Sequence, residues 1–349
     1  MTSDGVRSHI IFFYHDADTI ADFERICQTA HCLHLTRSYP RGIWQYSRLI
    51  RNIMPDVLHS HSFQPLVWAS LLQTGQGRHV TTVHSNYSYF TARTAKDYAK
   101  NTIEKLILKR RGMHTVAVGK DVHALLAGLG VPARNLSLIE NGVDVTGYGL
   151  DGRARVDIRR ELGIESDQFV FVTLGRLDIA TKGYDILLRA FRQTCQQHRN
   201  AILLFIGDGP DKAKLAGMAD SLGVAKQVKF IGFKKNPANY LYAGDAYVCS
   251  SVVEGFGLAV AEALLCGLPV IATRVGAIPE MVEHGTSGLL VEPSDAAAIA
   301  AAQDDFICRR YPLAEMARLG KQRVVEKYDI HKTAATYVRL YRSVMESGR

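Results

Sequence analysis

Residues 250–262 read SSVVEGFGLAVAE and join a strand end, a glycine turn and the start of a helix. Glu254 precedes the Gly-Phe-Gly turn, and Glu262 lies eight residues later within an apolar run typical of a buried helix. The pattern therefore predicts Glu254 on a loop and Glu262 about two turns into the helix. The glycines leave the first backbone N–H groups of that helix uncovered, which creates a seat for a phosphate or a sugar hydroxyl. Carboxylates beside this seat would accept hydrogen bonds from ribose or hexose hydroxyls.

The length of 349 residues predicts about two domains, and the 47% hydrophobic and 22% charged residues are those of an ordinary soluble protein. No run approaches the roughly 20 apolar residues of a membrane-spanning helix, and the N-terminus has no signal-peptide core. These features predict a cytoplasmic protein. The six cysteines form no Cys-x-x-Cys pair, so we expect reduced core residues rather than disulfides or metal ligands.

The net charge of +8 indicates an anionic partner. Nucleic acid is disfavoured because the basic residues do not interleave with stacking aromatic residues and no nucleic-acid-binding motif is present. The densest basic stretch covers residues 96–111. It is interpreted as a solvated helix face, with contact to an anionic membrane surface or a phosphorylated acceptor as the alternative.

Strand and helix patterns alternate twice along the chain, which predicts two domains built on parallel sheets. Strands are expected at 9–14, 30–35, 56–62, 79–83, 115–118 and 136–139, and again at 169–174, 201–206, 228–231, 246–249, 268–273 and 288–291. The glycine-rich segment 144–153 is the best linker candidate. We therefore expect doubly wound, Rossmann-like domains at 1–147 and 148–328 that face a cleft, with a helix at 329–349 packing back on the first domain.

Three histidines fall at predicted strand ends in the first half of the chain, where parallel sheets bind ligands. They are His59, His61 and His84. His59 and His61 form a His-x-His pattern that could suggest a metal, but no third ligand stands at a sensible spacing. We interpret His59 and His61 as structural, and no metal site is predicted.

Several stretches together resemble the retaining GT-B glycosyltransferases of family 4, which transfer a sugar from a nucleotide donor. They are PDVLHSH (55–61), ENGVD (140–144), GRL (175–177) with Lys182-Gly183, GDGP (207–210), EGFG (254–257) through Glu262, CGLPVIA (266–272) and GLLV (288–291). Each stretch alone is a weak indication of the family, but the order and spacing of all of them over residues 55–291 are typical of it. The resemblance implies a GT-B fold.

The resemblance also implies roles for individual residues. Arg176 and Lys182 would hold the donor diphosphate, and two cations there would stabilise the charge of the departing nucleotide. Since these cations would replace a divalent metal, no cofactor is expected. Glu254 would bind the transferred sugar, Glu262 the ribose, and His84 would reach the sugar and acceptor side. The remaining donor-binding residues implied are Gly207, Asp208, Gly209, Gly255, Phe256, Gly257 and Leu258.

The N-terminus departs from the family pattern, which opens with a strand running into a glycine-rich loop. Only about fifty residues precede Pro55, and none has that glycine-rich character. Residues 9–14 fit the family's second strand, so we expect the first strand and its loop to be missing. The alternative is that residues 9–14 are the first strand and 15–18 a divergent loop.

The predicted activity is transfer of a hexose from a UDP-sugar, or a GDP-sugar, to a saccharide or lipid-linked acceptor in surface glycan synthesis. The eight-residue spacing separates the two glutamates by about 10 Å or more on a regular helix, too far for a two-carboxylate glycosidase mechanism. We therefore favour attack from the leaving group's own face. Two alternatives remain: a nucleotide-sugar 2-epimerase, or a nucleotide-sugar-binding homologue with impaired catalysis.

Overall fold

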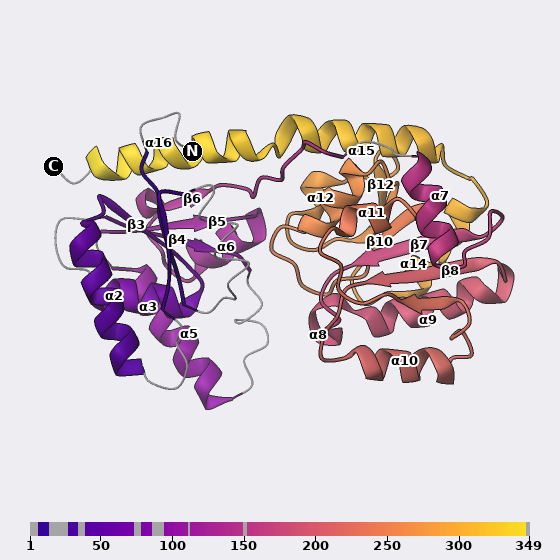
Figure 1. The fold of residues 1–349 in the computed structure, drawn as a ribbon, viewed down its shortest axis with the longest axis horizontal. Helices are drawn as coiled ribbons and strands as arrows, with labels where there is room; N and C mark the ends of the chain where they lie inside the picture. Colours follow the sequence, from indigo (N-terminus) through magenta and orange to yellow (C-terminus); the bar gives the residue numbers. More distant parts are fainter. Residues whose placement is uncertain are drawn as a thin grey trace.

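The structure is a computed structural model that describes residues 6–13, 27–33, 39–72, 78–85, 94–110, 112–148 and 152–346. Within these residues it forms two α/β domains (Figure 1). This confirms the predicted architecture of two Rossmann-like domains with parallel sheets. No described helix is both long enough and apolar enough to cross a bilayer.

The described strands of the first domain form two separate parallel sheets. One pairs β1 (His9–Phe12) with β2 (Thr29–Cys32), and the other has the order β3-β4-β5-β6. The second sheet comprises β3 (Val57–His61), β4 (Arg78–Val83), β5 (Met113–Ala117) and β6 (Leu136–Leu138). The helices are α2 (Tyr39–Ile53), α3 (Phe63–Leu72), α5 (Ala95–Leu108) and α6 (Lys120–Gly128), with the 3₁₀ turn η2 (Ala133–Asn135).

The second domain is built on a six-stranded parallel sheet of order β12-β11-β10-β7-β8-β9. Its strands are β7 (Phe169–Leu174), β8 (Ala201–Ile206), β9 (Val228–Phe230), β10 (Ala246–Cys249), β11 (Val270–Thr273) and β12 (Gly288–Val291). The helices are α7 (Gly152–Glu161), α8 (Ile179–Lys182), α9 (Tyr184–Gln197), α10 (Lys212–Ser221), α11 (Pro237–Leu241), α12 (Leu258–Leu265), α13 (Ile278–Met281), α14 (Ala296–Ile307) and α15 (Leu313–Lys327).

The strand order of this sheet fixes the place of a ligand site. From β7 the chain proceeds outward through β8 and β9, and then returns to the other side of β7 with β10, β11 and β12. The reversal lies between β7 and β10, and the loops at the carboxyl ends of strands diverge at such a point. The strands β7, β8, β10 and β11 are almost wholly buried and apolar, as expected when helices cover both faces of a sheet.

The last helix, α16 (Ile330–Glu346), leaves the second domain and lies along the first (yellow in Figure 1). Tyr337, Leu340 and Tyr341 pack against a small buried cluster that includes Val80 and Val116 of the first sheet. The crossing is tight, because an added methyl group on Gly142 would lie 2.5 Å from the Cα of Ile330. The chain therefore passes between the domains twice.

The described strands of the first domain do not form one continuous sheet. Among the described residues β1 pairs only with β2, and β3 only with β4. Phe13 and Leu33, which follow β1 and β2, are buried with Tyr46 and Trp68 of the neighbouring helices. The predicted divergent loop at 15–18 lies outside the described residues, so the choice between the two interpretations of residues 9–14 stays a prediction.

Four helices of the second domain were missing from the sequence prediction. They are α7, α8, α11 and α13, of which α8, α11 and α13 have four or five residues. A single hydrogen-bonded turn produces no apolar periodicity, so hydrophobic pattern cannot reveal it. Helix α7 begins at Gly152 inside the predicted linker, and its Arg155 and Arg159 bind Asp245 at the start of β10.

Candidate functional site

The loop after β7 carries Lys182 to the edge of the sheet through the short helix α8. Asp178 caps this helix by accepting hydrogen bonds from the backbone N–H groups of Ala180 and Thr181. Gly183 ends it in the left-handed conformation, with φ of 59°. A side chain at Gly183 would clash with the carbonyl oxygen of Ser250 at 2.4 Å, so the loops after β7 and β10 are in backbone contact.

Lys182 and Glu254 form an ion pair across these two loops. Both side chains are largely buried, with 23% and 16% of their surface exposed. Burial alone would lower the pKa of Lys182, but the charge and hydrogen bond of Glu254 outweigh it and the pKa is raised. Two predicted catalytic residues that are 72 positions apart in the chain therefore meet as a charged pair.

Two serines that the sequence reasoning missed hold this pair. The Ser251 hydroxyl donates to Glu254 Oε1 at 2.9 Å, and the Ser250 hydroxyl donates to the Lys182 carbonyl oxygen at 2.8 Å. Thr273 of β11 donates to the Ser251 carbonyl oxygen at 2.7 Å. All three are buried. The spacing Ser-x-x-Glu was visible in the sequence as a local capping pattern and could have indicated the contact.

The Gly-Phe-Gly turn presents its backbone rather than its aromatic ring. Phe256 is buried against Tyr328, with ring centroids 5.2 Å apart. Gly257 takes φ of 90° and precedes α12, whose first residue Leu258 is 47% exposed. Within the described part of the chain, the backbone N–H groups of Leu258 and Ala259 have no hydrogen-bond acceptor. They are free to bind an anion, as the sequence predicts.

Arg176 is the second predicted cation and differs from Lys182 in its surroundings. It is exposed and makes no ion pair among the described residues. The glycines of the loop after β8 support its backbone: a methyl group on Gly207 would lie 2.0 Å from the Gly175 carbonyl oxygen. A methyl group on Gly209 would lie 2.5 Å from the Leu177 carbonyl oxygen. Asp208 is exposed and pairs with Lys212 at 3.0 Å. The predicted Gly-Asp-Gly residues therefore buttress the Arg176 loop.

Glu262 lies on α12, as predicted, and is half-buried. Burial raises its pKa. The small pocket behind the ion pair is lined by residues that include Lys182, Tyr184, Tyr247, Glu254 and Val260, and Glu262 is not among them. The structure thus brings Glu254 and Lys182 together and places Glu262 apart from that pocket.

The first domain contributes His84, which follows β4. Its Nε2 lies 2.8 Å from Nδ1 of His61, and the two rings stack with centroids 5.1 Å apart. His59 in turn lies against His61 and hydrogen-bonds to Tyr341 of α16 at 2.7 Å. Burial lowers the pKa of His84, His61 and His59, which favours neutral rings.

The two domains meet where the His84 carbonyl faces the donor-loop glycine. A methyl group added to Gly255 would lie 1.8 Å from the His84 carbonyl oxygen, and one added to Gly119 would lie 3.0 Å from the Gly255 carbonyl oxygen. Lys120 of the first domain pairs with Glu280 of α13 at 3.4 Å. The structure therefore places His84 beside the loop that carries Glu254, at the contact between the two domains.

Two family models match the chain. The model of glycosyl transferases group 1 matches residues 154–323, and that of Glycosyltransferase Family 4 matches residues 1–146. The chain belongs to the family 4 glycosyltransferases. It is 24% identical over 298 residues to N-acetyl-alpha-D-glucosaminyl L-malate synthase of Bacillus anthracis, which covers 84% of this chain and 76% of the relative. It is 28% identical over 303 residues to an uncharacterised glycosyltransferase of Methanocaldococcus jannaschii, covering 83% and 76%.

Solved structures show the same GT-B fold. Anabaena HepE in complex with UDP-glucose has a TM-score of 0.85 at 20% identity, over 96% of this chain and 91% of that protein. Sucrose-phosphate synthase from Thermosynechococcus elongatus has a TM-score of 0.77 at 23% identity, over 90% and 81%. The family acts on sugar donors.

Proposed function

We propose that this glycosyltransferase transfers a hexose from a UDP-sugar to a saccharide or lipid-linked acceptor with retention of configuration. The observation that carries the proposal is the Lys182–Glu254 pair beside the free N–H groups of α12. The ion pair and these N–H groups place a cation, an acceptor for sugar hydroxyls and a binding position for an anion next to one another. We favour a UDP-sugar over a GDP-sugar because a structure of HepE contains UDP and glucose. A GDP-mannose-dependent mannosyltransferase of Mycolicibacterium smegmatis is 33% identical over 56% of this chain, so GDP-sugars belong in the test.

In this proposal the diphosphate lies against Lys182, Arg176 and the first turn of α12. Lys182 has three N–H donors and one goes to Glu254, which leaves two for the diphosphate. Negative charge grows on the leaving diphosphate as the glycosidic bond breaks, so these contacts strengthen in the transition state. We propose that they replace a divalent metal in catalysis.

Glu254 is fixed by Ser251 and Lys182 and accepts hydrogen bonds from hydroxyls of the transferred sugar. A carboxylate committed to an ion pair is a poor nucleophile, which favours attack by the acceptor from the face that the diphosphate leaves. The departing phosphate oxygen then takes the acceptor's proton. His84 borders the site from the first domain and would contact the sugar on the acceptor side, while Glu262 would bind the ribose.

The test measures nucleotide release and sugar transfer with UDP- and GDP-sugars and a panel of glycan and lipid-linked acceptors. Glu254→Gln and Lys182→Met should each lower turnover at least 100-fold, whereas Lys214→Met, an exposed lysine of the same domain, should not. Unchanged turnover in Glu254→Gln or in Lys182→Met would contradict the proposal. Incubation with nucleotide sugar alone separates it from an epimerase, which would change the sugar without acceptor.

We also propose a cytoplasmic location at an anionic membrane surface, based on the exposed face of α5. Lys96, Lys105 and Lys109 alternate there with Tyr98, Ile103 and Leu106, whose exposed fractions are 61%, 45% and 64%. Basic and apolar side chains on one helix face bind the headgroup region of anionic bilayers. Surface glycan synthesis on lipid-linked acceptors would need this contact.

Sedimentation with vesicles tests the membrane contact. The protein should sediment with vesicles rich in anionic lipid and remain in solution with zwitterionic ones. Lys105→Glu with Lys109→Glu should abolish sedimentation. The same charge change at Lys214 and Lys226 of the second domain, both exposed, should not. Equal loss in both double variants would show a dependence on net charge alone and contradict a specific face.

A further inference from the structure

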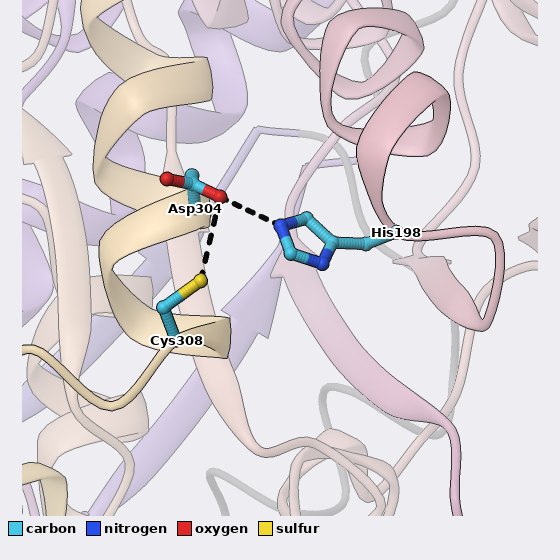
Figure 2. A group of neighbouring side chains, drawn as sticks. All are labelled: His198, Asp304 and Cys308. Carbon is cyan, nitrogen blue, oxygen red and sulfur yellow. Dashed lines mark hydrogen bonds and ion pairs between the residues drawn. The ribbon is translucent and has the colours of Figure 1, made fainter.

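A cluster of three possible metal ligands lies in the second domain away from the donor loops. It consists of His198, Asp304 and Cys308 (Figure 2). His198 is the C-terminal cap of α9, Asp304 belongs to the last turns of α14, and Cys308 caps α14. Both helices start after the carboxyl ends of strands and run back, so their C-termini lie at the amino edge of the sheet. The donor loops lie at the opposite edge.

The geometry suits a tetrahedral ion. Asp304 Oδ1 accepts a hydrogen bond from His198 Nε2 at 2.6 Å, and from Cys308 Sγ at 3.6 Å. All three ligand atoms lie within 4.8 Å of one another. Bond lengths of about 2.0–2.3 Å to zinc put neighbouring ligand atoms roughly 3.3–3.8 Å apart in a tetrahedron. Binding would therefore displace the shared proton and separate His198 Nε2 and Asp304 Oδ1 from 2.6 Å to about 3.3 Å.

The electrostatics of the cluster also suit a cation. Two helix C-termini converge on it, and each carries a partial negative charge. Arg310 pairs with the other oxygen of Asp304 at 2.7 Å and with Asp305 at 2.5 Å, so one guanidinium faces two carboxylates. This pairing orients Asp304 with Oδ1 toward the ligands, as outer-shell partners of metal ligands do. A Cys308 thiolate and a divalent ion would bring the group to neutrality.

The surroundings leave room for a fourth ligand. The side chains of His198 and Asp304 are 18% and 23% exposed, and Cys308 is exposed. Water can therefore complete the coordination. Thiolate, imidazole and a single carboxylate are the ligands of zinc, whereas magnesium and calcium require several oxygen ligands.

We propose that His198, Asp304 and Cys308 form a zinc site that joins the ends of α9 and α14 and stabilises the second domain. Nothing in the proposed transfer reaction requires it, since the donor loops are at the other edge of the sheet. The expectation from sequence, that the cysteines are core residues, fits Cys195, Cys249 and Cys266, which are buried. It does not fit Cys308.

Cobalt is the probe that tests this site. Untagged, reduced and chelator-treated protein titrated with Co²⁺ should develop the sulfur-to-cobalt charge-transfer absorption of a thiolate complex, with one equivalent bound, and Zn²⁺ should displace it. Cys308→Ser keeps a hydroxyl that can bond Asp304 but provides a poor zinc ligand, so the band should disappear. His198→Gln should weaken cobalt binding at least tenfold. Cys27→Ser and His331→Gln are the controls and should bind as the unaltered protein does.

Thermal unfolding provides a second measurement that is independent of activity. Zinc should raise the midpoint of the unaltered protein and of both controls, because an ion bound only to the native state stabilises it by mass action. The rise should be absent in Cys308→Ser and smaller in His198→Gln, and the metal-free melts of both variants show whether they fold. Absence of the cobalt band in the unaltered protein, or its survival in Cys308→Ser, would overturn the proposal.

Discussion

Gly255→Ala tests whether the contact between the His84 carbonyl and the donor loop is needed for turnover. The new methyl group would lie 1.8 Å from the His84 carbonyl oxygen, while real Cβ atoms stay at least 3.0 Å from other atoms. Backbone of one domain must therefore move about 1.2 Å away from the other. Misplacement by about 1 Å costs on the order of 100-fold in rate, which equals about 2.7 kcal/mol in the activation barrier.

We expect turnover of Gly255→Ala to fall about 100-fold, measured as nucleotide release with saturating donor. Donor binding to the second domain, measured as a thermal shift, should change less because the methyl group points at His84. Gly119→Ala is the graded control at the same seam, since its methyl group would lie 3.0 Å from the Gly255 carbonyl oxygen and a small adjustment relieves it. If Gly255→Ala kept full turnover, the contact between His84 and Gly255 would not be required for activity.

Three further changes test the hydrogen bonds and buried histidines. Ser251→Ala removes the 2.9 Å hydrogen bond to Glu254 and should lower kcat about tenfold, the equivalent of roughly 1.4 kcal/mol, with little change in KM in steady-state kinetics. The control is Ser221→Ala, which removes an exposed serine hydrogen bond elsewhere in the domain. An equal loss of kcat in both variants would indicate that Ser251 contributes only general stability. Tyr341→Phe leaves His59 Nδ1 without its 2.7 Å partner and should reduce the free energy of unfolding by about 1–3 kcal/mol in urea titrations; no change would show that α16 docks through apolar contacts alone. Burial lowers the pKa of His79 from 6.5 to about 4, so the unfolded chain binds the proton first as pH falls. His79 should therefore contribute about 1.4 kcal/mol per pH unit to the decline in stability from pH 6.5 toward pH 4, in addition to the contributions of His59, His61 and His84. His79→Asn should flatten that slope in denaturation curves, and parallel slopes would contradict the assignment.

The fold could be predicted from the sequence because its signals are local. Each buried strand of the second domain is a short apolar run ended by glycine or polar residues. Helix α9 shows a clear apolar face, and α12 is apolar on almost every side. The short helix α8 escaped prediction since one turn has no period. Its N-cap Asp178 was in the sequence, but a loop aspartate has many other uses.

The site was predicted only in part because its residues act across long chain separations. Glu254 and Lys182 were each predicted from the sequence motif that contains them, but neither motif indicates that the two side chains form an ion pair. The stacking of His61 on His84 depends on the register of β3 against β4, which aligns His61 with Thr82. Sequence reasoning placed both residues at strand ends and still assigned only one to the site.

Gly255 illustrates why local sequence patterns could not predict the contact between the two domains. In the sequence it belongs to a glycine turn, for which backbone flexibility is the usual reason. Its φ is not in the left-handed region, so the conformation alone would permit alanine. What demands glycine is the carbonyl of a residue 171 positions earlier in the other domain. Under the proposed function, Gly255 would serve both the binding of the donor in one domain and the fit of the two domains. We therefore expect a substitution there to reduce turnover more than donor binding.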